Sequence, residues 1–320
     1  MISGVVVKST GSWYLVMLED FTIVKCRIVG KFKINGMKLT NPVGVGDRVQ
    51  FEYETSNQID EVHNGVIKVI LPRENYIVRQ SPRQLHYLHL LAANVHQAIL
   101  LTTIREPNLK QGFIDRFLLM TEPQNIPTII VFNKSDILEA EDMELFESMR
   151  SIYEAIGYTV QLVSAHDSHS LEALKRLLKD KNTFMCGQSG VGKSTLINSI
   201  QPQLDIRTEE ISDYSGKGQH TTTFAEMHLL DFGGTIIDSP GIKSLSFNNL
   251  SLQDVAHNFR EIFVASSDCK YGDCLHRNEP NCNVKDKVHA GEIDANRYVS
   301  YLQILDEIEN QNYWELHTDM

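Results

Sequence analysis

Several features of membrane and secreted proteins are missing from this sequence. No apolar run approaches the roughly 20 residues that a membrane-spanning helix needs. The first residues show neither a charged leader with a long apolar core nor a small-residue cleavage site, so we expect no signal peptide and a cytoplasmic protein. Internal repeats and low-complexity segments are also absent. The 320 residues suffice for about two or three globular domains, and we expect a monomer.

Basic side chains are fewer than acidic ones. The net charge of −11 argues against a protein coated in basic surface, although the distribution of charge matters more than its sum. Residues 22–40 contain five basic side chains and no acidic one, whereas residues 300–320 contain five acidic side chains and neither Lys nor Arg. The two ends of the chain are therefore electrostatically different.

The first 73 residues have the pattern of an all-β domain. Five short runs of β-branched and aromatic residues alternate with Gly, Asn and Pro. These runs lie at residues 3–9, 12–18, 21–28, 47–54 and 64–70. Five short strands suit a small closed barrel, for which the OB-fold is the commonest architecture and an SH3-like barrel the alternative. Residues 71–83, with two prolines and several charges, indicate a linker.

After residue 83 the pattern changes to alternating strands and helices. Strands are predicted at residues 96–104, 127–132, 158–165 and 182–187, with two more around the Gly233-Gly234 turn. Helices are predicted at residues 112–124, 140–157, 170–180 and 193–201. This alternation indicates a doubly wound α/β sheet that binds ligands outside the carboxyl ends of its strands. From residue 246 the pattern is mostly helical, so we expect an OB-fold domain at 1–73, an α/β domain at 74–245 and a helical domain at 246–320.

The segment GQSGVGKS, residues 187–194, matches the phosphate-binding pattern G-x-x-x-x-G-K-S. It follows a predicted strand and opens a predicted helix, which is the context that the pattern requires. Its glycines let backbone N–H groups face phosphates, and the helix N-terminus adds partial positive charge. Lys193 is expected to reach the β- and γ-phosphates, and Ser194 to bind Mg²⁺. The predicted nucleotide contacts of this loop are Gly187, Gln188, Ser189, Gly190, Val191, Gly192, Lys193, Ser194 and Thr195.

Two later segments complete a predicted γ-phosphate and magnesium site. Asp238 ends an apolar strand in DSPG, where a carboxylate typically holds Mg²⁺ through water, and Gly241 can donate its N–H to the γ-phosphate. The Gly- and Thr-rich segment 215–226 has the composition of a switch loop, with Thr222 as the first choice of switch threonine and Thr221 as the second. An ordinary turn and a surface loop are the alternatives. The expected Mg²⁺ ligands are Ser194, Thr222 and Asp238.

The tetrapeptide NKSD, residues 133–136, follows an apolar strand and indicates a guanine-binding loop. Asp136 can accept both N–H groups of guanine's Watson–Crick edge, a donor pair that adenine lacks. Asn133 would address the other edge of the purine, and Lys134 would pack on the sugar and base. Ser164 and Ala165 end the next strand, where GTPases place a second guanine-contacting loop. Because these loops precede the phosphate loop, we predict a circularly permuted GTPase domain.

The residue that would orient the attacking water is not the usual one. Ordinary GTPases often place Gln directly after Asp-x-x-Gly, but Ile242 occupies that position and can neither position nor polarise water. In the switch segment, His220 is the predicted catalytic residue and Gln219 is the neighbouring alternative. Packing or RNA contact is the other interpretation of His220.

Three of the five cysteines lie within fourteen residues, together with a histidine. In a cytosolic chain such clustering favours a metal site over disulfides. Three thiolates and one imidazole suit tetrahedral Zn²⁺ in a closed structural site, which leaves no open position for catalysis. His289 is a weaker alternative ligand. The predicted ligands are Cys269, Cys274, His276 and Cys282.

Taken together, NKSD, GQSGVGKSTLIN, GQHTTT, DSPGI and C-x4-C-x-H-x5-C resemble the RsgA (YjeQ) family of circularly permuted bacterial ribosome-assembly GTPases over nearly the whole chain. The resemblance implies GTP hydrolysis stimulated by the small ribosomal subunit, a role in late subunit maturation, and rRNA contact through the OB and zinc domains. It also implies an apolar residue in place of the catalytic Gln, as Ile242, and a switch-loop His, as His220. Gln219 departs from the family, which commonly has Arg there.

The basic stretch near the N-terminus is the predicted contact with RNA phosphates, and a solvated loop and strand face is its alternative. Its residues are Lys25, Arg27, Lys31, Lys33 and Lys38. A GTP-sensing rRNA-binding module in which hydrolysis is incidental is the alternative function. An ATPase or kinase that only shares the phosphate loop is disfavoured by NKSD.

Overall fold

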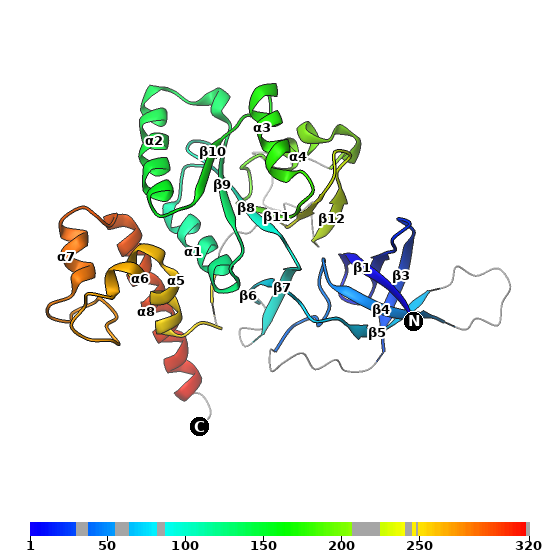
Figure 1. Ribbon diagram of the computed structural model, residues 1–320, viewed down its shortest axis with the longest axis horizontal. Coiled ribbons are helices and arrows are strands. Elements are labelled where there is room, and N and C mark those ends of the chain that lie inside the picture. The colour runs from blue at the N-terminus through cyan, green and yellow to red at the C-terminus, as the bar shows by residue number, and fades with distance from the viewer. Residues whose placement is uncertain are drawn as a thin grey trace, which may run out of the picture.

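The five predicted N-terminal strands form a closed barrel in the computed structural model (Figure 1). They are β1 (Ile2–Ser9), β2 (Tyr14–Met17), β3 (Ile23–Ile28), β4 (Arg48–Tyr53) and β5 (Gly65–Ile70). The order β1-β2-β3-β5-β4 closes through the pairing of β4 with β1, and β3 runs parallel to β5. Alternate residues such as Val6, Val16 and Phe51 fill the barrel interior. This connectivity confirms the OB-fold and not the SH3-like alternative.

The structure describes residues 1–29, 38–54, 64–81, 87–206, 225–240, 245–247 and 249–317, with side chains described up to residue 310. Among these residues, no helix is both long and apolar enough to cross a bilayer.

A second hairpin corrects the prediction of a linker at residues 71–83. Within that segment lies β6 (Tyr76–Gln80), which pairs antiparallel with β7 (Leu88–Ala93). The linker prediction was wrong because prolines and charges near the ends of the segment mask a short strand. Ile77 and Val78 are both buried, and Val78 packs with Leu88 and Leu90 of the partner strand.

The central sheet has six strands beyond the hairpin. They are β8 (Gln97–Thr103), β9 (Thr128–Asn133), β10 (Thr159–Leu162), β11 (Asn182–Gly187), β12 (Glu226–Leu229) and β13 (Thr235–Asp238). Their spatial order is β10-β9-β8-β11-β13-β12, and all pairings are parallel except that of β12 with β13. The strand that leads into the phosphate loop, β11, therefore sits in the middle of the sheet, although it is fourth in chain order. This is the arrangement that a rejoined chain predicts.

Helices cover both faces of this sheet, as expected for buried parallel strands. They are α1 (Gln111–Thr121), α2 (Ala140–Ala155), α3 (Ser168–Leu178) and α4 (Lys193–Ile200), with short 3₁₀ turns η1 (Glu122–Gln124), η2 (Ser135–Ile137) and η3 (Pro202–Leu204). Alternation along β8 shows the two layers, because Ile99 and Leu101 join the core under α3 and α4, whereas Ala98 and Leu100 join the core under α1 and α2. Asp167 caps α3 by accepting hydrogen bonds from two backbone N–H groups.

The C-terminal region is helical, as predicted, and flanks the sheet on the side away from the barrel (Figure 1). Its helices are α5 (Leu252–Asn258), α6 (Arg260–Ser266), α7 (Asn283–His289) and α8 (Ala295–His317). Apolar residues of α5, α6 and α8 belong to the same core cluster as those of α1 and α2. The barrel meets the sheet through a pairing between β1 and β12 that joins the two sheets edge to edge, and its residues Val7 and Val45 join the same core cluster.

Candidate nucleotide and metal sites

The predicted phosphate loop lies between β11 and α4, at the carboxyl edge of the central sheet. Gly190 and Gly192 have φ of +85° and +87°, a region that favours glycine. A Cβ on Gly192 would also lie 2.6 Å from Nδ2 of Asn133, so only glycine fits there. The loop thus enters α4 with its backbone in the conformation that a phosphate cradle requires.

Lys193 and Asp238 meet at this edge, as the sequence predicted for a phosphate and magnesium site. The Lys193 ammonium forms an ion pair with Asp238 and donates a hydrogen bond to the Ser239 carbonyl oxygen at 2.6 Å. Both charged side chains are buried. Because β11 and β13 are adjacent parallel strands, their carboxyl ends bring the two groups together from positions 45 residues apart. Ser239, whose carbonyl oxygen accepts from the lysine, was not predicted.

The two predicted guanine loops are hydrogen-bonded to each other. The Ser164 hydroxyl donates to Oδ1 of Asp136 at 2.5 Å and accepts from the His166 backbone N–H at 3.0 Å. The hydrogen bond from Ser164 holds the pKa of Asp136 below its ordinary value. Asp136 is therefore fixed as an exposed, ionised acceptor, the form that a pair of N–H donors requires. Ala165 lies in the same loop after β10.

Asn133 and Lys134 link the guanine loop to its surroundings. Nδ2 of Asn133 donates to the Val191 carbonyl oxygen at 2.9 Å, which ties the end of β9 to the phosphate loop. Lys134 has a left-handed backbone and its ammonium donates to the Glu106 carbonyl oxygen at 2.6 Å. The sequence did not indicate the contact with the phosphate loop. Contacts of both residues with a purine nucleotide stay predictions.

Several predicted residues lie outside the described part of the chain. They are Lys31, Lys33, Gln219, His220, Thr221, Thr222, Gly241 and Ile242. Ser194 and Thr195 are described and half-buried in the first turn of α4. The switch loop, the catalytic histidine and the γ-phosphate contact therefore stay predictions.

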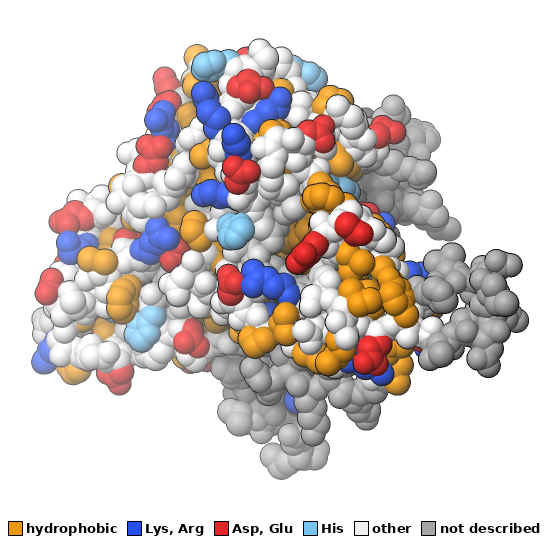
Figure 2. Space-filling view, turned by 45° about the vertical axis from the view of Figure 1, so that its right-hand side comes forward, with side chains coloured by type: hydrophobic (Ala, Val, Ile, Leu, Met, Phe, Trp, Pro, Cys, Tyr) orange, Lys and Arg blue, Asp and Glu red, His pale blue; other side chains and the backbone are white. Residues whose placement is uncertain are grey.

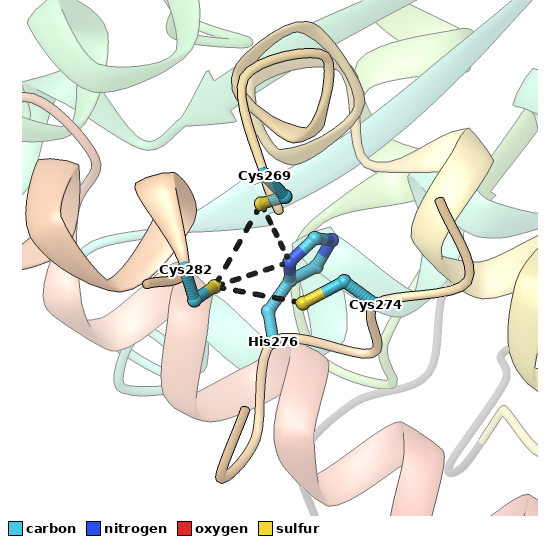
Figure 3. Close-up of side chains that lie close together, drawn as sticks. All are labelled: Cys269, Cys274, His276 and Cys282. Carbon is cyan, nitrogen blue, oxygen red and sulfur yellow. Dashed lines mark hydrogen bonds between the residues drawn. The ribbon is translucent and has the colours of Figure 1, made fainter. Parts of the chain in front are cut away.

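The predicted metal ligands converge in one cluster (Figure 3). Cys269 follows α6, Cys274 and His276 lie in the connecting loop, and Cys282 is the N-cap of α7. Their ligand atoms all lie within 4.8 Å of one another, and Nδ1 is the imidazole nitrogen that faces the sulfurs. His289, the alternative ligand, is exposed and is not a member of the cluster.

Tyrosines of α8 hold the loop that contains Cys274 and His276. The Tyr298 hydroxyl donates to the His276 carbonyl oxygen at 2.5 Å, and the Tyr301 hydroxyl donates to the Leu275 carbonyl oxygen at 2.9 Å. Burial raises the pKa of Cys274 to about 12 and lowers the pKa of His276. Burial alone thus disfavours the thiolate, whereas a cation at the centre of the cluster would favour it. The donor set fits a metal ion with four ligands.

Two of the predicted RNA contacts lie on the outer face of β3. Lys25 and Arg27 are exposed, the Lys25 ammonium sits 4.2 Å from the centre of the Trp13 ring, and Arg27 pairs with Glu54 at 2.5 Å. Hydrophobic side chains gather on the barrel side of the face shown in Figure 2, and elsewhere on that face positive and negative groups are interspersed. The exposed hydrophobic residues of the barrel include Phe21 and Ile23.

Comparisons with known proteins identify the family of the chain. A model of the RsgA GTPase family matches residues 70–248, and a model of the RsgA N-terminal domain matches residues 3–59. A protein of Phocaeicola vulgatus named small ribosomal subunit biogenesis GTPase RsgA is 43% identical over 98% of this chain and 99% of its own length. Its namesake from Christiangramia forsetii is 44% identical over 98% of both chains.

Two solved structures are also similar over nearly the whole chain. YjeQ from Thermotoga maritima has a TM-score of 0.72 and 32% identity, covering 96% of this chain and 98% of that one. YloQ, described as a circularly permuted GTPase, has a TM-score of 0.69 and 30% identity, covering 97% and 96%. The strand order, the phosphate and guanine loops and these full-length similarities lead to one conclusion: the chain belongs to the RsgA family of circularly permuted GTPases.

Proposed function

We propose that this GTPase binds the small ribosomal subunit, assists its late maturation, and hydrolyses GTP faster when the subunit is bound. The observation that carries the nucleotide assignment is the Ser164–Asp136 hydrogen bond at the same sheet edge as Lys193 and Asp238. The names of the relatives, each a small ribosomal subunit biogenesis GTPase, support the subunit as partner. Because ribosomes assemble in the bacterial cytoplasm, we propose that the protein acts there, as a monomer.

The described residues divide the binding of GTP between two loops. Asp136 accepts from guanine, and the backbone N–H groups from Gly187 to Thr195 surround the phosphates. When GTP binds, the Lys193 ammonium leaves the Asp238 carboxylate and pairs with the β- and γ-phosphates. The Asp238 carboxylate is then free for the magnesium site with Ser194 and Thr222. When bound, Mg²⁺ supplies positive charge that neutralises the phosphates. The N–H of Gly241 and the side chain of Thr221 complete the proposed γ-phosphate contacts.

His220 is the proposed group that orients the attacking water, because Ile242 replaces the usual Gln. A His220→Ala variant should lose most of the subunit-stimulated turnover while binding GDP normally. A matched His169→Ala variant, changed on an exposed histidine of α3, should retain it. Unchanged turnover in His220→Ala would contradict the assignment.

Zinc is the proposed metal of the C-terminal cluster, as one structural ion. Zn–S bonds of about 2.3 Å at tetrahedral angles require sulfur atoms about 3.8 Å apart, and Zn–N bonds of about 2.0–2.1 Å place sulfur and nitrogen about 3.6 Å apart. The Sγ atom of Cys282 lies 3.9 Å from that of Cys269 and 3.8 Å from that of Cys274. Nδ1 of His276 lies 3.6 Å and 3.4 Å from the sulfurs of Cys269 and Cys282.

Contact with rRNA is proposed for the basic stretch of the N-terminal domain, through Lys25, Arg27, Lys31, Lys33 and Lys38, of which Lys25 and Arg27 lie on the outer face of β3. Subunit binding should then weaken with rising salt and after Lys25→Glu substitution, while Lys175→Glu, a change on α3 of the α/β domain, serves as control. Equal losses from both variants would point to net charge and not to this face.

The decisive experiment measures GTP turnover with and without purified small subunits, with large subunits as control. We expect a rise in kcat of orders of magnitude with small subunits and little change with large ones. Binding of small subunits without stimulation would instead favour the GTP-sensing rRNA-binding module. Absence of GTP binding would contradict the nucleotide assignment itself.

A further inference from the structure

A row of charged side chains crosses the sheet from the barrel to the phosphate loop. Lys8 of β1 is directly opposite Glu226 of β12, and Glu226 is directly opposite Asp238 of β13. Directly opposite residues of antiparallel strands point to the same face of a sheet. This is the face that α4 covers, because Ile236, two residues before Asp238, packs in the core under α4.

Glu226 and Asp238 are like-charged neighbours, and such pairs are destabilising unless each charge is compensated. Each carboxylate has a lysine from a different part of the molecule. The Lys8 ammonium lies 2.7 Å from Oε2 of Glu226, and the Lys193 ammonium pairs with Asp238. About a third of the Lys8 and Glu226 side chains is exposed, whereas Lys193 and Asp238 are buried. The barrel therefore supplies one of the two positive charges that balance this carboxylate pair.

His228 lies near all four of these charges. It lies on β12, two residues from Glu226 and on the same face. Burial lowers the pKa of His228; Glu226 and Asp238 oppose that effect, and Lys8 and Lys193 add to it. All four charges are thus close enough to influence one imidazole.

The barrel strand is shaped for this contact. The register of β1 with β2 shifts between Val6 and Lys8, so that Val7 is an extra residue on β1. Val6 fills the barrel interior, whereas Val7 joins the core of the α/β sheet with Met227 of β12. Bulges commonly re-aim side chains in this way. Here the bulge lets consecutive residues serve the barrel core, the sheet core and Glu226.

We propose that Lys8 is a positioning residue for the nucleotide site, supplied by the barrel: by neutralising Glu226, it leaves Lys193 free to exchange Asp238 for the phosphates of GTP or GDP. Without Lys8, two adjacent carboxylates would hold Lys193 more strongly and repel the anionic phosphates. The inference rests on the proposed nucleotide contacts of Lys193 and Asp238. It adds that a residue outside the α/β domain sets nucleotide affinity.

One consequence follows from the reciprocity of linked equilibria. If the barrel raises nucleotide affinity when Lys8 contacts Glu226, bound nucleotide must favour the same seating of the barrel by an equal free energy. A partner that pulls the barrel from β12 would then promote nucleotide release. β12 also directly follows the predicted switch loop, so the barrel touches the strand that the switch leads into.

The test is a titration with a fluorescent GDP analogue in excess Mg²⁺. Lys8→Glu should weaken binding roughly fivefold or more through the added negative charge, and Lys8→Gln by less. Lys8→Arg should bind within about twofold of the unaltered protein, because it keeps the charge. Replacing Glu226 by Gln in the Lys8→Glu protein should relieve part of the defect by removing one of the two added uncompensated charges, and added salt should shrink the defect by screening. Arg48→Glu is the matched control. It breaks the exposed ion pair between Arg48 of the barrel and Glu74, which lies away from the pairing of β1 with β12.

The outcomes separate this inference from the proposed function. Normal GDP binding by Lys8→Glu, or a defect that Glu226→Gln fails to relieve, overturns the role of Lys8 alone. GDP binding that survives Lys193→Ala overturns the nucleotide site. Thermal unfolding followed by circular dichroism verifies that each variant is folded. If Lys8→Glu is unfolded, Lys8→Gln is compared with the Lys8→Gln/Glu226→Gln double variant, and GDP binding by this pair tests the role of Lys8.

Discussion

The central sheet contacts its two flanking regions in very different ways. Towards the barrel, β1 pairs with β12, Val7 and Val45 join the core of the α/β region, backbone hydrogen bonds join residues 38–47 to β7, and the Lys8–Glu226 ion pair is partly exposed. Towards the C-terminal helices, the apolar core is continuous, and a buried ionic group spans the boundary. Interfaces that are large and apolar hold their parts together, whereas small ones permit relative motion. We infer that the partly exposed pairing of β1 with β12 opens at less cost than the boundary with the C-terminal helices, where the ionic group is buried.

The buried ionic group shows how firm the second contact is. Arg297 of α8 lies 2.5 Å from Oδ1 of Asp115 on α1 and 2.6 Å from Glu261 on α6, and the Tyr153 hydroxyl of α2 donates to the same Asp115 oxygen at 2.8 Å. The side chains of Asp115 and Arg297 are almost completely buried. Four helices from both sides of the boundary therefore meet at one guanidinium.

Metal removal should produce the largest difference between the two flanks. A structural zinc contributes on the order of 10 kcal/mol or more to the folding of small zinc domains. Chelation should therefore abolish hydrogen-exchange protection in α6 and α7 and reduce it in α8 and α1, which share their core. Protection of barrel strands β1 to β5 should not change. Cys282→Ser should reproduce this pattern and show no further response to chelator, and loss of protection in the barrel would refute the comparison.

Among substitutions of one charged side chain, Arg297→Met should lower the free energy of unfolding the most. It leaves Asp115 and Glu261 buried without their cation, which costs about 3–5 kcal/mol in the free energy of unfolding. Denaturant titration measures this loss, and Arg150→Met, which breaks an exposed pair on α2, should cost under about 1 kcal/mol.

The pH dependence of the Arg297→Met defect has a definite sign. Burial raises the pKa of Asp115, and the positive charge of Arg297 opposes that rise. Without Arg297 the folded pKa rises further above the unfolded value. Such a group favours the folded state below its unfolded pKa and loses that contribution as pH rises. The defect should therefore be smaller at pH 5 than at pH 8, and a defect that grows on acidification would exclude this explanation.

The sequence predicts the site better than it predicts these contacts, for a physical reason. NKSD, the phosphate loop and DSPG each follow a buried parallel strand, and the carboxyl ends of such strands meet at one edge. Local patterns therefore sufficed to bring Asp136, Lys193 and Asp238 to one edge. The Cys/His cluster was predictable because its four members lie within fourteen residues.

Contacts between distant, unpatterned residues were not predictable. Lys8 and Glu226 are 218 residues apart, and Asp115 and Arg297 are 182 apart. Nothing in their neighbourhoods distinguishes them from ordinary charged residues. Strand β6 was missed because it pairs with a strand beyond a segment that contains proline and charge, so the partner that stabilises it is not visible locally.

A third substitution, Arg260→Ala, tests the outer part of the firm contact. Arg260 of α6 donates to both carboxylate oxygens of Glu122, at 2.8 Å and 3.0 Å, and lies 4.0 Å from the centre of the Tyr158 ring. Its side chain is 37% exposed, so we expect a loss of only about 1–2 kcal/mol in the free energy of unfolding. Arg105→Ala, at a similarly exposed arginine paired within the α/β domain, should cost less than Arg260→Ala does. Equal losses would show that the boundary has no special strength there.

The smallest expected effect on stability belongs to Lys8. Its ion pair with Glu226 is exposed enough for water and salt to screen it, so Lys8→Gln should cost no more than about 1 kcal/mol in the free energy of unfolding. The same substitution should measurably weaken GDP binding, because Glu226 is then uncompensated beside Asp238. Denaturant titration measures the contribution of Lys8 to stability, and GDP titration measures its contribution to nucleotide affinity. A stability measurement alone would not separate the two. A loss of several kcal/mol would mean that the barrel is held as firmly as the C-terminal helices, and the contrast between the two flanks would disappear. A small loss of stability together with weakened GDP binding means that the contact between the barrel and β12 is coupled to nucleotide binding. Such coupling is possible because this contact can open at little cost in free energy.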